Sequence, residues 1–324
     1  MSVRASLSPG AASRARAQIE GSPGDRIMRG LTILGALVTV LTLGDVIYQV
    51  VNGASPSLSK YGLGFLTRSD WSPNLLHFGA LPMLIGLGVS SLIALVISVP
   101  MAIAIAVYLS MLAPKWVRAV VGPLVEMLAA IPSVILGFWG IIILAPFIQS
   151  TIEPALHSVL GFIPIFGEPQ TTGESVFTAG VILTIMVVPI IASLSRDLFL
   201  SVSSELKDAA EALGATQWEV IRGVVFPTTF SGVSAAIMLG LGRALGEAIA
   251  VASVIGDGSI AHTSVFETGN TPAARIALEI QFFINPLQKA SLFYLAFILL
   301  VIGLTVNLIA RSIASRYDVH RTFV

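Results

Sequence analysis

The chain contains no cysteine among its 324 residues, which excludes a disulfide framework, a thiolate metal site and a thiol nucleophile. Histidine is scarce too: the four histidines lie far apart in the sequence, so we expect no histidine metal centre. Charged residues make up only 11% of the chain, whereas soluble domains have about 25%. The 18 basic and 18 acidic residues cancel, which excludes a nucleic-acid-binding protein that relies on bulk positive charge.

Apolar residues, in contrast, make up 55% of the chain. They gather in six runs, each long enough for a membrane-spanning helix of about 20 residues. We expect the spans at about 28–51, 80–112, 119–148, 175–194, 228–254 and 290–310. The first run is too long for a cleaved signal peptide and no small-residue cleavage site follows it. The sequence therefore predicts an all-α polytopic membrane protein, with a transmembrane domain at 28–311 between a disordered tail at 1–27 and a short tail at 312–324.

Basic residues are unevenly distributed between the segments that join the runs. If both termini are cytoplasmic, the inner side holds thirteen of the 18 Lys and Arg residues. The outer side then holds Lys60, Arg68, Arg275 and Lys289, and Arg243 lies within a run. Because cytoplasmic loops carry an excess of Lys and Arg, this distribution predicts a multi-pass protein with both termini in the cytoplasm.

Prolines interrupt the expected helices at several points. Pro123, Pro132 and Pro146 predict a kinked or broken third span. Irregular backbone within a membrane is tolerated only where it is buried in protein or lines a cavity. Ser133 is therefore a candidate contact for a passing substrate, and a kink that only aids packing is the equal alternative. Pro227 is expected to end a cytoplasmic helix and to introduce the fifth span.

A polar block rich in helix-forming residues precedes that proline, at 196–227. Ser204 is a candidate N-cap for a first short helix, which Gly214 is expected to end. Thr216 is a candidate N-cap for a second helix, and Glu219 three residues later completes a capping box. Apolar surface for a partner is expected from Trp218, Val220, Ile221, Val224 and Val225.

This block resembles a known motif. Asp208-Ala209-Ala210, then Gly214, then Val225-Phe226-Pro227 is similar to the EAA loop of ABC importer permeases, which docks in a groove of the ATPase subunit. The family usually has Glu in place of Asp208 and Leu in place of Phe226. The resemblance implies that the ATPase-coupling residues are Asp208, Ala209, Ala210, Glu211, Gly214 and Pro227. On the residues alone, an ordinary cytoplasmic helical hairpin is the alternative.

The fifth run contains two charged residues, Arg243 and Glu247. Charges within a span are costly and usually functional, and a spacing of four places both on one helix face, where they can pair. Arg243 lies about 22 Å along a helix that begins at Thr228, so snorkelling to the outer headgroups is the competing explanation. Gly240, Gly242 and Gly246 favour an interior position because small residues permit close helix packing.

A guanidinium can form two hydrogen bonds to one oxyanion, and a nearby carboxylate would partly neutralise it when no substrate is bound. We therefore expect Arg243 to contact an anion in transit and Glu247 to tune that contact. Three stretches, the 240–247 sequence GLGRALGE, the 129–133 sequence AAIPS and the aromatic segment at 61–82, resemble the PstC family of permease subunits of phosphate ABC importers.

The resemblance covers about 29–311 and implies a MetI-like permease fold in a bacterial plasma membrane. It also implies a PstA-like second permease, a PstB-like ATPase dimer and a PstS-like extracytoplasmic phosphate-binding protein as partners. No G-x-x-x-x-G-K-[ST] pattern occurs in the chain. We therefore expect a non-catalytic subunit that binds no cofactor or metal, with ATP and Mg²⁺ used by the partner ATPase.

Two other functions remain open on the sequence. The substrate could be a different oxyanion, such as sulfate or molybdate. The chain could also be a channel or a signalling subunit that does not transport. Among the remaining acidic residues, we expect a structural role for Glu126, a solvated position for Asp257, and a solvated loop or a binding-protein contact for Glu153, Glu168 and Glu174.

Overall fold

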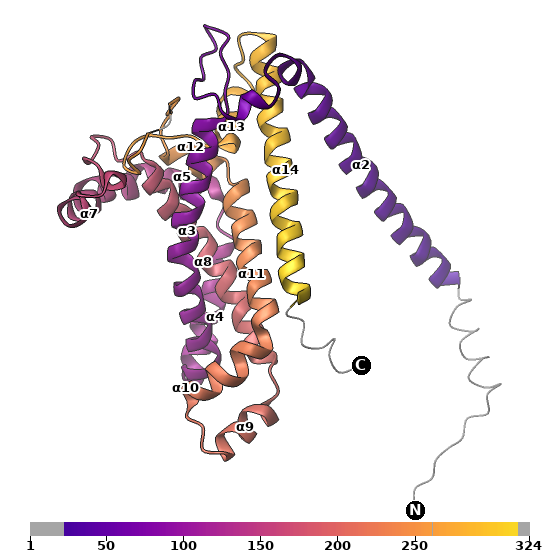
Figure 1. The fold of residues 1–324 in the computed structure, drawn as a ribbon. Coiled ribbons are helices and arrows are strands. Elements are labelled where there is room, and N and C mark those ends of the chain that lie inside the picture. Colours follow the sequence, from indigo (N-terminus) through magenta and orange to yellow (C-terminus); the bar gives the residue numbers. More distant parts are fainter. Residues whose placement is uncertain (1–22, 261, 317–324) are drawn as a thin grey trace, which may run out of the picture. The chain divides into compact units, whose positions relative to one another are not determined.

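The computed structural model describes residues 23–260 and 262–316, and within these ranges its regular structure is helical (Figure 1). Six helical stretches are long and apolar enough to cross a membrane. They are Gly24–Leu66, Leu81–Leu112, Ser133–Leu160, Val176–Ser201, Gln217–Gly246 and Pro286–Ile313. Four of the thirteen basic residues expected on the inner side lie outside the described residues: Arg4, Arg14, Arg16 and Arg321.

The chain divides into two units, 1–52 and 53–324. The described part of the first unit is the beginning of helix α2, Pro23–Tyr61. Large apolar side chains such as Leu34 and Leu41 are exposed along it, as expected of a helix that buries its surface in lipid or against another subunit. Because α2 begins at Pro23, residues 23–27 are helical and do not belong to the expected disordered tail.

Two helices, α3 (Leu81–Val107) and α8 (Val176–Ser201), form the centre of the second unit. The buried face of α3 repeats small residues every fourth position, which allows neighbouring segments to approach its backbone closely. The buried residues of this series are Gly86, Ser90, Ala94, Ser98, Ala102 and Ala106. A Cβ atom at Gly180 of α8 would lie 2.6 Å from Ile93 Cγ2, so this contact requires glycine.

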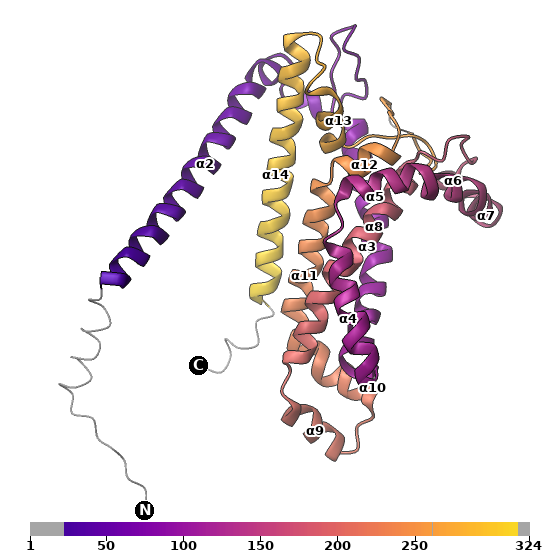
Figure 2. The same ribbon diagram turned by 180° about the vertical axis from the view of Figure 1, so that it is seen from behind.

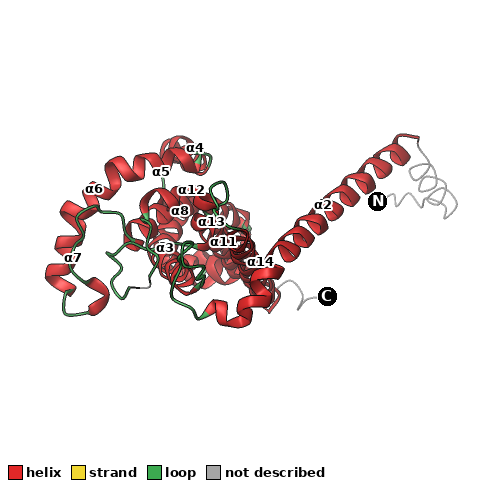
Figure 3. Ribbon diagram, turned by 90° about the horizontal axis from the view of Figure 1, so that it is seen from above, coloured by secondary structure: helices red, strands yellow, loops and turns green. Residues whose placement is uncertain are grey.

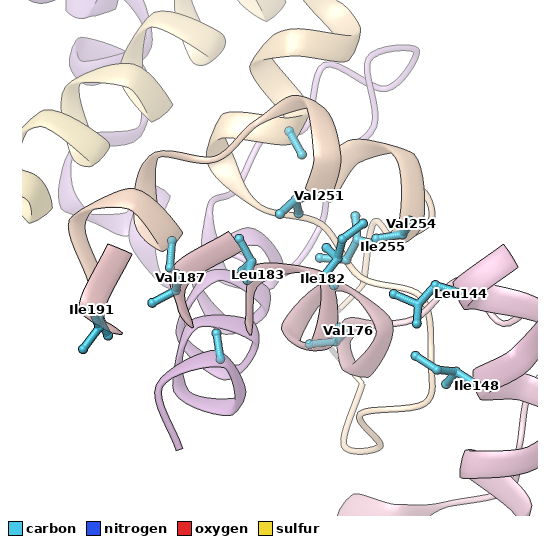
Figure 4. Close-up of a cluster of buried hydrophobic side chains, with 14 of the residues drawn as sticks. Leu144, Ile148, Val176, Ile182, Leu183, Val187, Ile191, Val251, Val254 and Ile255 are labelled. Atoms are coloured by element: carbon cyan, nitrogen blue, oxygen red, sulfur yellow. The ribbon is translucent and has the colours of Figure 1, made fainter. Parts of the chain in front are cut away.

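The most enclosed span is α8: 72% of its most apolar stretch is buried, against 28% or less in the other five spans. Helices α3, α4 (Lys115–Ala129), α11 (Phe226–Gly246) and α12 (Ile249–Val254) pack around it. Its side chains Ile182, Leu183 and Val187 pack in one apolar cluster with Val251 and Val254 of α12 (Figure 4). The apolar residues of the fourth run therefore form the core of the unit.

The third predicted span is divided in two. Helix α4 ends at Ala129, and α5 (Ser133–Trp139) begins after Pro132, whose backbone is extended (φ −59°, ψ 134°). From α5 the helix continues through π-helical turns, α6 (Ala145–Phe147) and α7 (Glu153–Leu160). Seen from above, α5, α6 and α7 follow an arc away from α8 (Figure 3). The apolar candidate span is thus Ser133–Leu160 and not 119–148, because the break falls at the proline within that run.

The fifth span also differs from its prediction of 228–254. Pro227 does not end the preceding helix, because a π-helical turn at Ile221–Val225 joins α10 (Gln217–Val220) to α11 and places the proline in the first turn of α11. The helix ends instead at Gly246 and resumes as α12. The sixth helix, α14 (Pro286–Arg316), extends into the tail that was expected at 312–324.

The two ends of the second unit carry different structures (Figures 1 and 2). One end holds α9 (Ser204–Ala212) and α10. The opposite end holds α13 (Pro272–Glu279) and the segment before α3, where the rings of Trp71 and Phe78 meet edge to face with centroids 5.0 Å apart. This aromatic cluster extends through Phe65 to Tyr294 of α14, whose stacked rings lie 4.5 Å apart.

Candidate translocation site and coupling segment

Arg243 lies in the last turn of α11, and Glu247 is the residue at which this helix ends. The backbone of Glu247 is extended (φ −72°, ψ 124°). The two residues therefore do not lie on one face of a continuous helix, and the prediction from their spacing of four was wrong on this point. Nη2 of Arg243 nevertheless lies 3.9 Å from Oε2 of Glu247. This distance exceeds that of a charge-assisted hydrogen bond, so the pair is loose.

The two side chains have different environments. Glu247 is 9% exposed, and its Oε1 accepts a hydrogen bond of 3.3 Å from the backbone N–H of Ala250, in the first turn of α12. Arg243 is 40% exposed. The carboxylate is therefore held by the backbone at the break between α11 and α12, while the guanidinium remains available to a ligand.

Arg243 lines a cavity of about 720 Å³ between α8, α11 and α14. Gly242 and Gly246 line it too, and a Cβ atom added to either would meet nothing within 4 Å. Gly240 differs, since its Cβ atom would lie 2.8 Å from Val187 Cγ1 of α8. Of the three glycines expected to permit close packing, Gly240 alone does so within the described chain; the other two border open space.

Ser133 is the first residue of α5 and is partly exposed. It does not line the cavity around Arg243. Its helix packs on α12 through Gly137, where a Cβ atom would lie 2.8 Å from Ser253 Oγ. The breaks at Pro132 and Glu247 are thus followed by two helices that contact each other.

The coupling segment, α9 with α10, exposes most of the residues that the EAA resemblance indicates. Asp208, Ala209 and Glu211 are exposed on α9. Gly214 follows α9 in the left-handed conformation (φ 91°), so the expectation that it ends this helix is confirmed. Ala210 differs from the others because it packs against the chain's own apolar cluster around Phe199 and Val225.

The N-caps of the two short helices are visible as side-chain hydrogen bonds. The capping box is confirmed: Glu219 Oε2 accepts the Thr216 N–H at 2.8 Å, and Thr216 Oγ1 accepts the Glu219 N–H at 3.4 Å. The predicted cap of α9 was wrong by one residue. Ser203 is the N-cap, and Ser204 is the first helical residue.

The apolar surface of the coupling segment differs from its prediction. Val220, Ile221 and Val225 are buried within the chain, because the π-helical turn directs them into the unit. The exposed apolar residues are Trp218, Leu206 and Leu213, the last 91% exposed. Pro227 is exposed in the first turn of α11, next to Phe226, whose ring contacts that of Phe199 edge to face at 5.3 Å.

Several acidic residues have partners that the sequence did not reveal. Glu126 of α4 accepts a hydrogen bond of 2.6 Å from Arg196 of α8, in keeping with a structural role. Glu153 is fully buried and not in a solvated loop. It is the first residue of α7 and accepts hydrogen bonds of 3.3 Å from Ser175 Oγ, at the N-cap of α8, and of 3.4 Å from the backbone N–H of Gln170.

Comparison with known proteins identifies the family. Residues 98–319 match the family described as the binding-protein-dependent transport system inner membrane component. This chain belongs to that family. It is therefore a multi-pass plasma-membrane component of a transport system that depends on a binding protein, and the predicted all-α permease fold is confirmed.

The chain is similar to curated relatives over most of its length. The phosphate transport system permease protein PstC of Mesorhizobium japonicum is 40% identical over 298 residues, which cover 91% of each chain. PstC of Pasteurella multocida is 41% identical over 297 residues, which cover 90% of this chain and 92% of the relative. The resemblance to PstC predicted from the sequence is confirmed.

A solved structure of a bacterial ABC transporter contains a chain with the same fold. A chain of the bacterial alginate ABC transporter in complex with an alginate-pentasaccharide-bound periplasmic protein aligns with a TM-score of 0.58 at 17% identity, covering 91% of this chain and 97% of its own. At this identity the likeness concerns the fold alone.

One polar network of this chain could hardly be predicted from its sequence. Arg275 of α13, counted simply as an outer basic residue, is 4% exposed and binds Asp257 and Glu279, each at 2.8 Å. Trp71 Nε1 also donates to Glu279, at 3.1 Å. The spacing of four between Arg275 and Glu279 was the one available signal, whereas Asp257 and Trp71 are distant in sequence.

Proposed function

We propose that this chain is one of two permease subunits of an ATP-driven importer of inorganic phosphate and forms part of the translocation pathway. The similarity to PstC proteins supports the substrate. The observation that carries the proposal is the loose contact of Arg243 with Glu247, at 3.9 Å, beside a cavity between spans. A guanidinium in such a position can exchange a weak intramolecular contact for two hydrogen bonds to a phosphate oxyanion.

In this proposal Glu247 limits how tightly the anion is held. Its carboxylate is fixed by the Ala250 N–H and remains about 4 Å from the guanidinium, where it reduces the net positive charge that an arriving anion meets. Release is as necessary as binding for transport. Ser133, at the other helix break, offers a hydroxyl group as a second contact.

The coupling segment completes the proposal. Its exposed face, with Asp208, Ala209, Glu211 and Gly214 and the apolar side chains Leu213 and Trp218, would dock on a separate ATPase subunit that binds ATP and Mg²⁺. A PstA-like permease, a PstB-like ATPase dimer and a PstS-like binding protein would complete the importer. Both termini and the coupling segment would be cytoplasmic, and this chain would bind no cofactor or metal of its own.

Phosphate uptake by the Arg243→Gln variant tests the pathway. We expect uptake of radiolabelled phosphate to fall at least tenfold while the complex assembles normally. Arg29→Gln is the matched control, because Arg29 is an exposed arginine of α2 that lies outside both the cavity and the coupling segment. Normal uptake by a correctly assembled Arg243→Gln variant would disprove the proposal.

Two measurements separate this function from its alternatives. Uptake of labelled sulfate or molybdate in place of phosphate would indicate another oxyanion importer. Phosphate flux through the purified complex in liposomes tests the other alternative, a channel or a signalling subunit. A channel conducts phosphate without ATP, and a signalling subunit conducts none. A transporter of the proposed kind shows phosphate flux only with binding protein and ATP.

A further inference from the structure

The cavity beside Arg243 continues along α14, away from the break at Glu247. Its lining residues on α14 are Leu299, Gly303, Val306, Asn307, Ala310 and Arg311. We propose that this cavity is an aqueous stretch of the anion path, and that Asn307 and Arg311 are the next anion contacts after Arg243. The inference rests on the proposed function and extends it to residues that the sequence did not single out.

The charge of the lining favours an anion. The polar side chains that line the cavity are Arg243, Asn307 and Arg311, and no carboxylate lines it. The two arginine side chains carry only hydrogen-bond donors, and the side-chain amide of Asn307 offers two N–H donors. Within residues 23–260 and 262–316, no acidic side chain forms an ion pair with Arg311, and the one ion-pair partner of Arg243 is Glu247, at 3.9 Å. The rest of the lining is apolar, so the two charges on the cavity wall are both positive.

The helix geometry places these contacts in sequence along the axis of α14. Helices α11 and α14 run side by side in opposite directions (Figures 1 and 2). Arg311 lies eight residues beyond Gly303 on α14, which corresponds to about 12 Å, and Asn307 lies about midway. An anion leaving Arg243 toward the end with α9 and α10 would meet Asn307 and then Arg311.

The glycines of the cavity wall supply an independent argument. A Cβ atom at Gly242, Gly246 or Gly303 would meet nothing within 4 Å, so none of the three is needed to pack α11 on α14 or α8. Small residues here keep the cavity wide. Its volume of about 720 Å³ greatly exceeds the roughly 30 Å³ that one water molecule occupies in the liquid, which leaves room for a hydrated oxyanion.

Single cysteines test this path directly, because the natural chain has none. Gly303→Cys and Asn307→Cys place a thiol on the cavity wall. Leu304→Cys is the matched control, since Leu304 is exposed on the same helix beside Gly303 but does not line the cavity. Labelling of this chain by a charged methanethiosulfonate reagent is measured in membranes holding the assembled importer, without nucleotide and with ATP bound to a hydrolysis-deficient ATPase.

We expect the thiols at 303 and 307 to react at least tenfold faster than the thiol at 304 in one of the two states, and phosphate to slow their reaction. If a lipid tail or a helix of the second permease fills the cavity, they will react no faster than the control in either state, and the inference is wrong. If sulfate but not phosphate slows the labelling, the cavity is part of an anion path but the proposed substrate is wrong.

The role of Arg311 has its own test in phosphate uptake. We expect Arg311→Gln to lower the maximal rate of uptake at least fivefold in the assembled complex, and Arg311→Lys to restore most of it. Arg29→Gln removes the same charge outside the cavity and the coupling segment and controls for effects on membrane orientation. Equal uptake by the Arg311→Gln and Arg29→Gln variants would exclude Arg311 from the path.

Discussion

The ammonium group of Lys207 donates a hydrogen bond of 3.2 Å to the carbonyl oxygen of Phe199. Lys207 lies on α9 and Phe199 in the last turn of α8, so this bond joins the coupling segment to the most enclosed span of the unit. None of the residues of α9 is buried, and its inward side consists of Lys207 and Ala210. The side chain thus satisfies one of the carbonyl groups that the end of a helix leaves unpaired.

Replacement of Lys207 by Met should weaken the transmission of movement from α9 to α8. We expect phosphate uptake to fall several-fold while the assembled complex keeps its ATPase activity, so that more ATP is hydrolysed per phosphate. Lys207→Arg should restore coupling because it retains a charged donor. Lys115→Met is the control, since Lys115 is an exposed lysine outside this contact. An unchanged ratio of ATP to phosphate in Lys207→Met would contradict this role.

The glycines of α11 should respond differently to alanine. Gly240→Ala inserts a methyl group 2.8 Å from Val187 Cγ1, and such overpacking costs about 1–3 kcal/mol. Gly242→Ala adds a methyl group where nothing lies within 4 Å, and alanine favours a helix by about 1 kcal/mol. Thermal unfolding in detergent should show a lower Tm for the first variant and an equal or higher Tm for the second. The reverse order would refute this packing.

The stability of the network around Arg275 should depend on Arg275 much more than on Asp257. Arg275→Met leaves Glu279 without its cationic partner in a largely buried site, and breaking a buried pair costs about 3–5 kcal/mol. Asp257 is 73% exposed, and exposed ion pairs contribute about 1 kcal/mol or less. We expect Arg275→Met to lower the Tm strongly and Asp257→Asn to change it little. Similar shifts of Tm in both variants would contradict the larger contribution assigned to Arg275.

The capping box of α10 should stabilise the coupling segment locally. Thr216→Ala removes the N-cap acceptor of the Glu219 N–H, a change that costs about 1 kcal/mol. Hydrogen exchange should then become faster in residues 216–220 of the assembled importer. Ser204→Ala is the control, because Ser204 is not the N-cap of α9. Equal exchange in both variants would show that other contacts hold α10.

Local sequence patterns predicted much of the secondary structure, because spans, caps and proline breaks depend on residues that are neighbours in the sequence. Long apolar runs predicted six spans, and Thr216 with Glu219 predicted a capping box, since a cap needs only neighbouring residues. The break at Pro132 followed from the missing N–H of proline. The end of α11 at Glu247 was missed because the local signal there, Gly246, was interpreted as a packing residue. The helix stops where the Glu247 side chain accepts the Ala250 N–H.

The sequence by itself determined the class of the protein: too few charges for a soluble domain, spans of sufficient length, and motifs that resemble a transporter family. The tertiary structure decided what the individual residues do. It separated Gly240, which packs on α8, from Gly242, which borders a cavity, and it placed Asn307 and Arg311 with Arg243. Such assignments depend on contacts between helices distant in sequence, which the packing of complete side chains selects and short-range patterns do not encode.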